Sequence, residues 1–352
     1  MPFVKRSIIL LFALLAADGC TWLVDREARE IARHASLARL YAARFPVGAA
    51  VEPTQLDTRE GKLLAWHFNS VVAENAMKMP RLQPAEGRFD FDGADRIVAF
   101  ATERGMKVRG HTLLWPEETP EWLWRGAGGE PASRDVVRER LRSHIHAVVG
   151  RYRGRVYAWD VVNEAIDPGQ PGCLRNDRWH AVLGPEYMEW AFRYAREADT
   201  GARLFLNDYE TTDPARRACL LRVVTQLRAR GVPVDGMGHQ MHVELARPAV
   251  GEIEQTLAMF AALGVENQVT ELDMTLGSTR PDAGVLARQA ARYAELLAAF
   301  ARAGVTAVTF WGISDANTWL NRRGPAGVDQ PLLFDARQEP KPAYFAVKAV
   351  AP

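Results

Sequence analysis

The chain has 352 residues, of which 48% are hydrophobic and 25% are charged, and its formal net charge is +1. This mix is typical of a globular protein, and the length allows one large domain or two ordinary ones. The 44 basic and 43 acidic residues nearly balance, so bulk electrostatics draws the protein to no polyanion. We therefore expect no nucleic-acid partner.

The amino terminus predicts export. Lys5 and Arg6 precede an apolar run over residues 8–17 that is too short to span a bilayer comfortably. The small residues that follow end in Ala17-Asp18-Gly19-Cys20, which resembles a bacterial lipoprotein cleavage box with Asp18 as an imperfect member. We expect residues 1–20 to be a signal segment and the protein to be periplasmic, an outer-membrane lipoprotein or secreted. Ordinary signal cleavage, a fixed anchor and a misassigned start remain alternatives, and a lipid on Cys20 is the only expected tie to a membrane.

Two further cysteines, Cys173 and Cys219, lie in the body of the chain. Export permits a disulfide, but the sequence does not show that these two residues meet, and we predict two separate buried thiols. No paired-cysteine spacing indicates a zinc site.

Residues 25 to about 43 are rich in Ala, Arg and Glu, and they predict a surface or linking helix within a leading segment at 21–44. From Phe45 onward, short apolar runs alternate with longer amphipathic segments, which places the catalytic domain at 45–352. Helices are predicted over 97–104, over 133–152, from Asp213-Pro214 and over 281–303. Strands are predicted at Pro46–Val51, Ser70–Glu74, Lys107–His111, Val156–Asn163, Arg203–Asn207, Gly236–Met241, Gln268–Leu272 and Ala307–Trp311.

Eight strand–helix units over roughly 300 residues predict a single α/β domain, a (β/α)8 TIM barrel. A doubly wound open sheet would also alternate, but it favours a glycine-rich loop after its first strand, and residues 51–54 read Val-Glu-Pro-Thr. Polar residues recur where the predicted strands end, which is the rim where barrels build their active sites. They are Glu74, His111, Asn163, Glu164, Asn207, Asp208, Gln240, His242, Glu271 and Trp311.

Glu164 and Glu271 are the candidate catalytic residues. Glycosidic-bond cleavage needs one protonated and one ionised carboxyl, and each glutamate ends an apolar strand in a polar context. Asn163 beside Glu164 can bind a sugar hydroxyl, while His242 and Asp273 can hold Glu271 through hydrogen bonds. A single buried glutamate is more often an ion-pair partner, so the prediction depends on the two together.

Tryptophans near strand ends could stack on the apolar face of a sugar ring. Trp159 is expected in the core. Trp311 and Trp319 flank the polar loop at 314–317, where a binding role is favoured. No metal site is expected, because His239 and His242 lie on opposite faces of a strand and no HExxH pattern occurs. A serine nucleophile is disfavoured by the absence of a G-x-S-x-G elbow.

From about residue 36 to its end, the chain resembles glycoside hydrolase family 10, the retaining endo-β-1,4-xylanases. The matching segments are VAENAMKM (72–79), GRFDF (87–91), RGHTLLW (109–115), WDVVNEAI (159–166), LNDYE (206–210), GHQMHV (238–243), VTELDM (269–274) and FWGISDANTWL (310–320).

The resemblance implies that Glu164 is the general acid/base and Glu271 the nucleophile, with xylan or a xylo-oligosaccharide as substrate and no cofactor. It also implies that Tyr209 lies toward the leaving group and that Asp273 supports His242. A double displacement would retain the anomeric configuration and place the carboxyl groups about 5–5.5 Å apart. The implied glycone-binding residues are Glu74, Asn75, Lys78, His111, Trp115, Asn163, Gln240, His242, Trp311 and Trp319.

The chain departs from the family after RGHTLLW, where the family usually continues with His, a variable residue and Gln. Here Pro116, Glu117 and Glu118 follow. A carboxylate at position 118 only accepts hydrogen bonds, whereas glutamine both donates and accepts. We therefore hypothesise altered sugar binding at the distal glycone position, unless a nearby lysine or hydroxyl compensates.

Two other functions stay open. A retaining β-glycosidase of the same barrel class could act on decorated xylan, β-glucan or aryl glycosides, and a catalytically inactive sugar-binding protein would use the same cleft. The Glu74, Lys78 and Trp319 set favours xylose-sized rings. The protein is expected to be a monomer.

Overall fold

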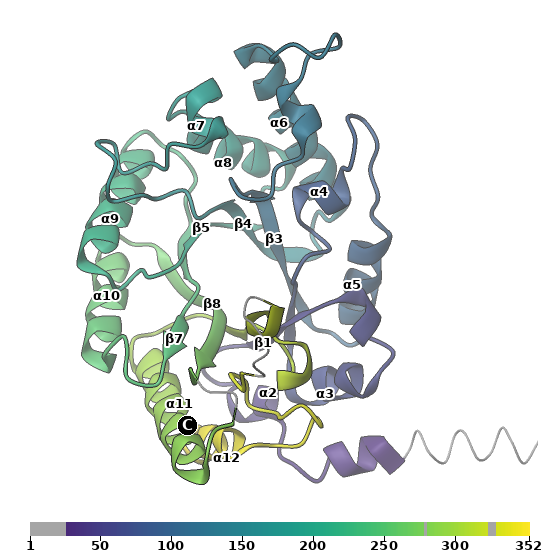
Figure 1. Ribbon diagram of the computed structural model, residues 1–352, viewed down its shortest axis with the longest axis vertical. Coiled ribbons are helices and arrows are strands. Elements are labelled where there is room, and N and C mark those ends of the chain that lie inside the picture. Colours follow the sequence, from purple (N-terminus) through teal and green to yellow (C-terminus); the bar gives the residue numbers. More distant parts are fainter. Residues whose placement is uncertain (1–25, 278–279, 323–328) are drawn as a thin grey trace, which may run out of the picture.

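The computed structural model describes residues 26–277, 280–322 and 329–352. Its centre is a closed ring of strands with helices around the outside, as the end-on view of Figure 1 shows. The predicted signal segment, including Cys20, lies outside the described residues. Among the helices within these ranges, none combines the length and the hydropathy needed to cross a bilayer.

Every strand pairing in the described ring is parallel, and a β6–β8 pairing closes it. β6 and β7 both pair with β8, so they are two parts of one position in an eight-position ring. The predicted (β/α)8 barrel is therefore confirmed. The strands are β1 (Val47–Val51), β2 (Ser70–Ala73), β3 (Lys107–Leu114), β4 (Val156–Asn163), β5 (Arg203–Asp208), β6 (Gly236–His239), β7 (His242–Glu244), β8 (Glu266–Thr275) and β9 (Val308–Phe310).

The sixth position of the ring differs from its prediction. The sequence predicted one strand from Gly236 to Met241, whereas β6 ends at His239 and β7 resumes at His242. Met241 has a φ of 60°, in the left-handed region, which interrupts an extended ladder. As predicted, the two histidines point apart: His239 is buried and bonded to Thr211 and Asn267, and His242 lies in the cleft described below.

Helices cover the outside of the ring, and α6 and α9 begin where the sequence predicts, at Ser133 and Asp213. The side chains of Ser133, Asp213 and Asp282 accept hydrogen bonds from backbone N–H groups in the first turns of α6, α9 and α11. Pro214 occupies the first position of α9, where no N–H is needed. The α-helices are α2 (Leu37–Leu40), α3 (Arg59–His67), α4 (Met79–Leu82), α5 (Asp92–Glu103), α6 (Arg134–Arg151), α7 (Arg178–Leu183), α8 (Tyr187–Ala198), α9 (Pro214–Ala229), α10 (Val250–Ala262), α11 (Ala283–Arg302) and α12 (Pro342–Ala349), and the 3-10 helices are η1 (Pro53–Gln55), η2 (Glu121–Trp124), η3 (Asp315–Asn317) and η4 (Trp319–Arg322).

The leading segment is not the single surface helix that its composition suggested. Residues 26–31 are helical, the chain then turns, and α2 follows as one short turn. Ile31 and Tyr41 are buried against the barrel, and the Tyr41 hydroxyl donates to the carbonyl of Val347 in α12. Tyr344 of α12 donates to Ala35 in return. These hydrogen bonds hold the leading segment against α12, near the other end of the described chain.

The prediction of two separate buried thiols was wrong. Cys173 and Cys219 form a disulfide with their Cα atoms 5.4 Å apart, within the usual range for such a bond. It connects the loop that follows β4 to helix α9 across 46 residues of sequence. Sequence separation alone carried no signal for this pairing.

The hydrophobic core includes the strands themselves, because these parallel strands are covered on both faces. Nearly every strand position is buried, as expected for a sheet enclosed by helices. Trp159 is fully buried, as predicted, and its ring occupies the space beside Gly110 on β3. A Cβ at position 110 would meet the Trp159 ring at 2.1 Å, so this close approach requires glycine.

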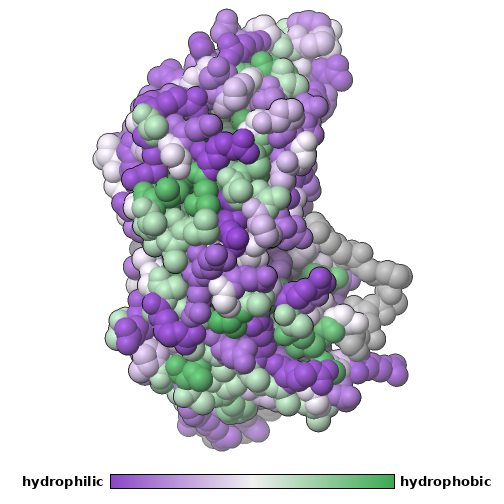
Figure 2. Space-filling model, turned by 90° about the vertical axis from the view of Figure 1, so that its left-hand side faces the viewer, coloured by the Kyte–Doolittle hydropathy of each residue, from purple (hydrophilic) through white to green (hydrophobic). Residues whose placement is uncertain are grey.

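The outer surface on the side of α9 and α10 is mixed. Figure 2 shows hydrophilic residues interspersed with small hydrophobic groups on this face, without one continuous apolar area. Among the described residues, the exposed large hydrophobic side chains are few: Val136, Met259, Phe345 and Val350. Such scattered exposure is ordinary for a protein surface.

Candidate active site

The carboxyl ends of the parallel strands surround a cleft with a cavity volume of about 450 Å³. The two candidate catalytic glutamates and all eleven predicted substrate-binding residues line it, so the structure brings together side chains spread over 246 positions of sequence, from 74 to 319. Its lining is Glu74, Asn75, Lys78, His111, Trp115, Glu117, Glu118, Asn163, Glu164, Tyr209, Glu210, Gln240, His242, Glu271, Trp311 and Trp319.

Glu164 follows directly after β4 and has a φ of 57°. A left-handed conformation is costly for a residue with a side chain, and here it turns the chain at the rim. The Glu164 carboxylate accepts hydrogen bonds from Trp115 Nε1 at 3.0 Å and from Gln240 Nε2 at 2.9 Å. Both oxygens are therefore oriented by donors that themselves line the cleft.

Glu271 lies within β8 and is 4% exposed. Its Oε1 accepts from Asn207 Nδ2 at 2.7 Å, and its Oε2 is 3.2 Å from His242 Nε2. The two glutamates are connected by a short chain of amides. Asn207 Nδ2 also donates to Asn163 Oδ1, which accepts from the Gln240 Nε2 that bonds Glu164. The two carboxylates thus face one small polar centre.

His242 is held between two carboxylates. Its Nδ1 is 2.8 Å from Asp273 Oδ1, and Asp273 Oδ2 accepts from Trp319 Nε1 at 2.6 Å. Burial disfavours the charged ring, but the charge of Asp273 and the hydrogen bonds to Asp273 and Glu271 outweigh it and raise the pKa of His242 to about 10. The His242 side chain keeps 22% of its surface exposed. A protonated His242 donates to both carboxylates.

A second histidine of the cleft, His111, is held by the buried residue Asp160. His111 Nδ1 lies 3.0 Å from Asp160 Oδ2, and Arg109 Nε donates to the same oxygen at 3.1 Å. Burial opposes the negative charge of Asp160, yet Arg109 and His111 hold the pKa of this carboxyl below its usual value. The His111 ring meets Trp311 edge to face, with centroids 5.3 Å apart. This buried group orients one wall of the cleft.

Lys78, which the family resemblance assigns to glycone binding, lines the cleft. Its Nζ donates to Asn75 Oδ1 at 2.9 Å and to Glu118 Oε1 at 3.0 Å, and it lies 4.6 Å from the centre of the Trp115 ring. A lysine therefore lies beside Glu118, as the alternative of compensation by a nearby lysine requires. Asn75 in turn donates to Glu52. Three predicted binding residues, Asn75, Lys78 and Trp115, therefore belong to the same network of contacts as Glu118, the residue that departs from the family pattern.

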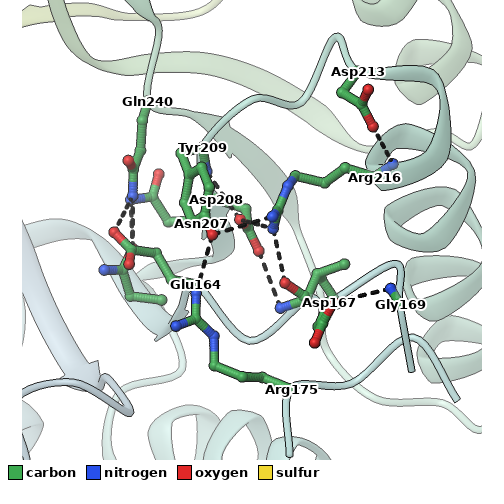
Figure 3. A network of polar contacts seen from close by, with 12 residues as sticks. Glu164, Asp167, Gly169, Arg175, Asn207, Asp208, Tyr209, Asp213, Arg216 and Gln240 are labelled. Atoms are coloured by element: carbon green, nitrogen blue, oxygen red, sulfur yellow. Dashed lines mark hydrogen bonds and ion pairs between the residues drawn. The ribbon is translucent and has the colours of Figure 1, made fainter.

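Tyr209, which the family resemblance assigns to the leaving-group side, also lines the cleft, and Figure 3 shows the contacts that hold it. Arg175 Nη2 and Arg216 Nη2 lie 3.2 and 3.1 Å from its hydroxyl oxygen. Behind it, Asp208 accepts from Arg216 Nη1 at 3.2 Å and from the Ile166 N–H at 3.3 Å. Burial raises the pKa of Asp208 to about 7, Arg216 opposes this shift, and the nearby charge of Glu164 adds to it.

The list of predicted site residues omitted several residues that the structure places at the site. Asn207 bonds Glu271 directly, and its position at the end of a predicted strand was the available signal. Glu210 and Glu117 line the cleft from loops, where no strand-end rule applies. Arg175 acts from behind Tyr209 and carries no sequence signal. In the described ranges, no group of three or more His, Cys, Asp or Glu side chains could hold a metal ion.

Similarity to known proteins agrees with this geometry. The model of glycosyl hydrolase family 10 matches residues 36–350. A thermostable celloxylanase of Thermoclostridium stercorarium is 43% identical over 334 residues, covering 89% of this chain and 86% of the relative. Endo-1,4-beta-xylanase B of Paenibacillus barcinonensis is 42% identical over 323 residues, with 89% and 97% covered.

Solved structures give the same result. Xylanase B from Clostridium stercorarium F9 aligns with a TM-score of 0.87 at 42% identity, covering 91% of this chain and 100% of that one. A mutant of the intracellular xylanase of Thermoanaerobacterium saccharolyticum, in complex with xylotetraose, aligns with a TM-score of 0.84 at 40% identity, covering 89% and 98%. With the family model spanning the barrel and relatives above 40% identity, this chain belongs to glycosyl hydrolase family 10.

Proposed function

We propose that the protein is an endo-1,4-β-xylanase that cleaves xylan by a double displacement with retention of anomeric configuration. The observation that carries the proposal is the pair of oriented carboxylates, Glu164 and Glu271, linked by amides at the centre of a cleft lined with tryptophan, amide and carboxylate side chains. Membership of a family whose named relatives are xylanases supports the substrate class.

In this proposal Glu271 attacks the anomeric carbon while Glu164 protonates the departing oxygen. Asn207 and the protonated His242 contact one oxygen each of Glu271, which orients the carboxylate. Water then hydrolyses the covalent glycosyl-enzyme, with Glu164 as the base. Once the sugar is bonded to Glu271, the negative charge of that carboxylate is gone, which favours the change of Glu164 from acid to base.

The acid/base role of Glu164 and the nucleophile role of Glu271 can be distinguished with substrates whose leaving groups differ in their need for a proton. Glu164→Gln should lose at least about a hundredfold in kcat/KM on xylan. It should retain the burst of a 2,4-dinitrophenyl xylobioside, because that phenolate leaves without a proton. Glu271→Gln should abolish both activities, whereas Glu121→Gln, an acid-to-amide change on the exposed η2, should alter neither. A first product with inverted configuration by NMR would refute the mechanism.

A second candidate substrate is β-1,4-glucan, because one relative is named a celloxylanase. Trp319 packs against His242, with ring centroids 5.0 Å apart, and lies over the cleft where a hydroxymethyl group would need room. We therefore favour xylose rings. Product analysis on xylan and on soluble cellulose separates the two, since a glucan-cleaving enzyme releases cello-oligosaccharides at comparable rates.

We also propose that the protein is exported and monomeric. The basic and apolar start of the chain supports export, as does the Cys173–Cys219 disulfide, which suits an oxidising compartment. A lipid on Cys20 remains part of the proposal. Fractionation with a Cys20→Ser variant tests the lipid, and light scattering on the purified protein tests the monomer.

A further inference from the structure

The loop that follows Glu164 is compact and bonded to itself. It runs from Ala165 to Arg175, and its two ends pair through an isolated Ile166–Leu174 bridge. The Asp167 N–H donates to the Cys173 carbonyl at 2.9 Å, and the Arg175 N–H donates to the Ala165 carbonyl at 2.8 Å. Backbone hydrogen bonds therefore hold the segment together, with Arg175 at its far end.

Helix α9 ties this loop to the barrel at two points. Cys219 forms the disulfide to Cys173 near the end of the loop. Arg216 Nη1 donates to the carbonyl of Ile166 at 2.7 Å near its beginning. Arg216 and Cys219 are three residues apart on α9 and so lie on one face of the helix. One tie is covalent and the other is a charge-assisted hydrogen bond.

The loop places Arg175 between two residues that line the cleft, Glu117 and Tyr209. Arg175 Nη1 lies 3.0 Å from Glu117 Oε1, and Nη2 lies 3.2 Å from the Tyr209 hydroxyl. Arg216 reaches the same hydroxyl at 3.1 Å, so two guanidinium groups meet one oxygen (Figure 3). Guanidinium groups only donate, so the Tyr209 oxygen accepts from both, and its own proton is left to point elsewhere. Tyr209 lines the cleft, where a sugar oxygen can accept it.

We propose that the Cys173–Cys219 disulfide holds Arg175 as a positioning residue, and that Arg175 and Arg216 together make Tyr209 a fixed hydrogen-bond donor to the sugar on the leaving-group side. The inference rests on the proposed xylanase function, and Arg175 acts through Tyr209. The enzyme would then bind its leaving-group sugar less well whenever the disulfide is open, while the chemistry at the two glutamates continues.

Two substrates separate this effect from the chemistry. Xylohexaose places sugars on both sides of the cleaved bond, whereas an aryl β-xylobioside places only an aryl group on the leaving-group side. Reduction by dithiothreitol transfers two electrons and two protons to the disulfide, which yields two thiols and the cyclic disulfide of the reagent. Reduced enzyme, and the Cys173→Ser/Cys219→Ser variant, should lose about tenfold in kcat/KM on xylohexaose, mainly through KM, as for one lost hydrogen bond. For the same reduced enzyme and double variant, kcat/KM on the aryl β-xylobioside should change less than about twofold.

Variants that leave the disulfide intact test the same contact. Arg175→Ala should reproduce the split between substrates, and Arg175→Lys should restore part of it, because lysine also donates. Tyr209→Phe should cause a loss of similar size, and adding Arg175→Ala to it should cause little more, since both act on one hydrogen bond. Arg178→Ala is the matched control, because Arg178 pairs with the exposed Glu121.

Equal losses on both substrates, or additive losses in the Arg175→Ala/Tyr209→Phe double variant, would overturn the proposal. So would a reduced enzyme with unchanged KM for xylohexaose. If the oxidised wild-type enzyme turned over neither xylohexaose nor the aryl β-xylobioside, the proposed function itself would be refuted. This result would be seen before any variant is made.

Discussion

Lys78 Nζ lies 3.0 Å from Glu118 Oε1 and 2.9 Å from Asn75 Oδ1, so this buried cation of the cleft is already bonded to two side chains. An ammonium group has three donors, which leaves one for a sugar hydroxyl. Glu118, as a carboxylate, adds no donor. Glu118 thus occupies one donor of Lys78, and we expect this to weaken sugar binding at the distal glycone position that the family resemblance implies.

Replacing Glu118 with Gln should raise kcat/KM on xylotriose by about three- to tenfold, through one recovered hydrogen bond. The value on an aryl xyloside, which does not reach the distal position, should stay the same. Steady-state kinetics on both substrates measures the effect. Glu121→Gln removes the same charge outside the cleft and serves as the control. Equal effects on both substrates would exclude distal binding as the cause.

The barrel and its rim could be predicted from the sequence for a physical reason. Parallel strands covered on both faces read as apolar runs, and a polar residue at the end of such a run has only the rim to occupy. Asn163, Glu164 and His111 were found in this way. Trp319 was favoured for binding by its place beside the polar loop at 314–317, and the family resemblance then supplied Lys78, which no periodicity singles out.

Other contacts carried no local signal. The Cys173–Cys219 bond joins a loop to a helix 46 residues away, and no spacing rule reports on such a pair. Arg175 reaches Tyr209 from a loop, and its role depends on how that loop closes. The break after His239 arises from the left-handed backbone at Met241, a residue that does not favour this conformation on its own. Tertiary contacts decide all three.

Asp273 supplies the charge that keeps His242 protonated. Asp273→Asn should therefore lower the pKa of His242 from about 10 toward the ordinary value near 6.5. Above that value the ring loses its positive charge and one of its two N–H donors, so its interaction with the Glu271 carboxylate weakens. We expect kcat/KM to fall by about ten- to a hundredfold at pH 8 and by much less at pH 5.5. The pH profile of kcat/KM between pH 5 and 9 shows the new alkaline loss.

Trp319→Phe is the matched comparison for that profile. It removes the hydrogen bond to Asp273 Oδ2 but leaves the carboxylate charge beside His242. Activity should drop because Trp319 lines the cleft, yet the shape of the profile should stay that of the wild type. An Asp273→Asn variant that loses the same factor at every pH would show that the charge of His242 is not what Asp273 provides.

The ion pair between Lys341 and Asp315 lies behind the last strand and is buried on both sides, with 2.9 Å between Nζ and Oδ2. Lys341→Met leaves the carboxylate without its cation, which should cost about 3 kcal/mol of unfolding free energy at pH 8. Burial raises the pKa of Asp315 to about 6 even with Lys341 present, so protonation below pH 6 removes the unpaired charge. Urea unfolding should show a clearly smaller loss at pH 5 than at pH 8. A loss independent of pH would indicate that packing, not charge, is the cause.

His67 is fully buried between Phe334 and Tyr344, with ring centroids 4.9 and 5.4 Å away, and within the described chain neither of its ring nitrogens has a hydrogen-bond partner. Burial first, and the charge of His34 second, lower its pKa to about 3. Between pH 6.5 and 3 the unfolded chain therefore binds a proton that the folded protein does not, and stability falls as the pH falls. One such histidine contributes a slope of about 1.4 kcal/mol per pH unit. His67→Phe should remove that slope from urea-unfolding free energies measured from pH 7 to 4.5, and wild-type and variant curves that run parallel would contradict it.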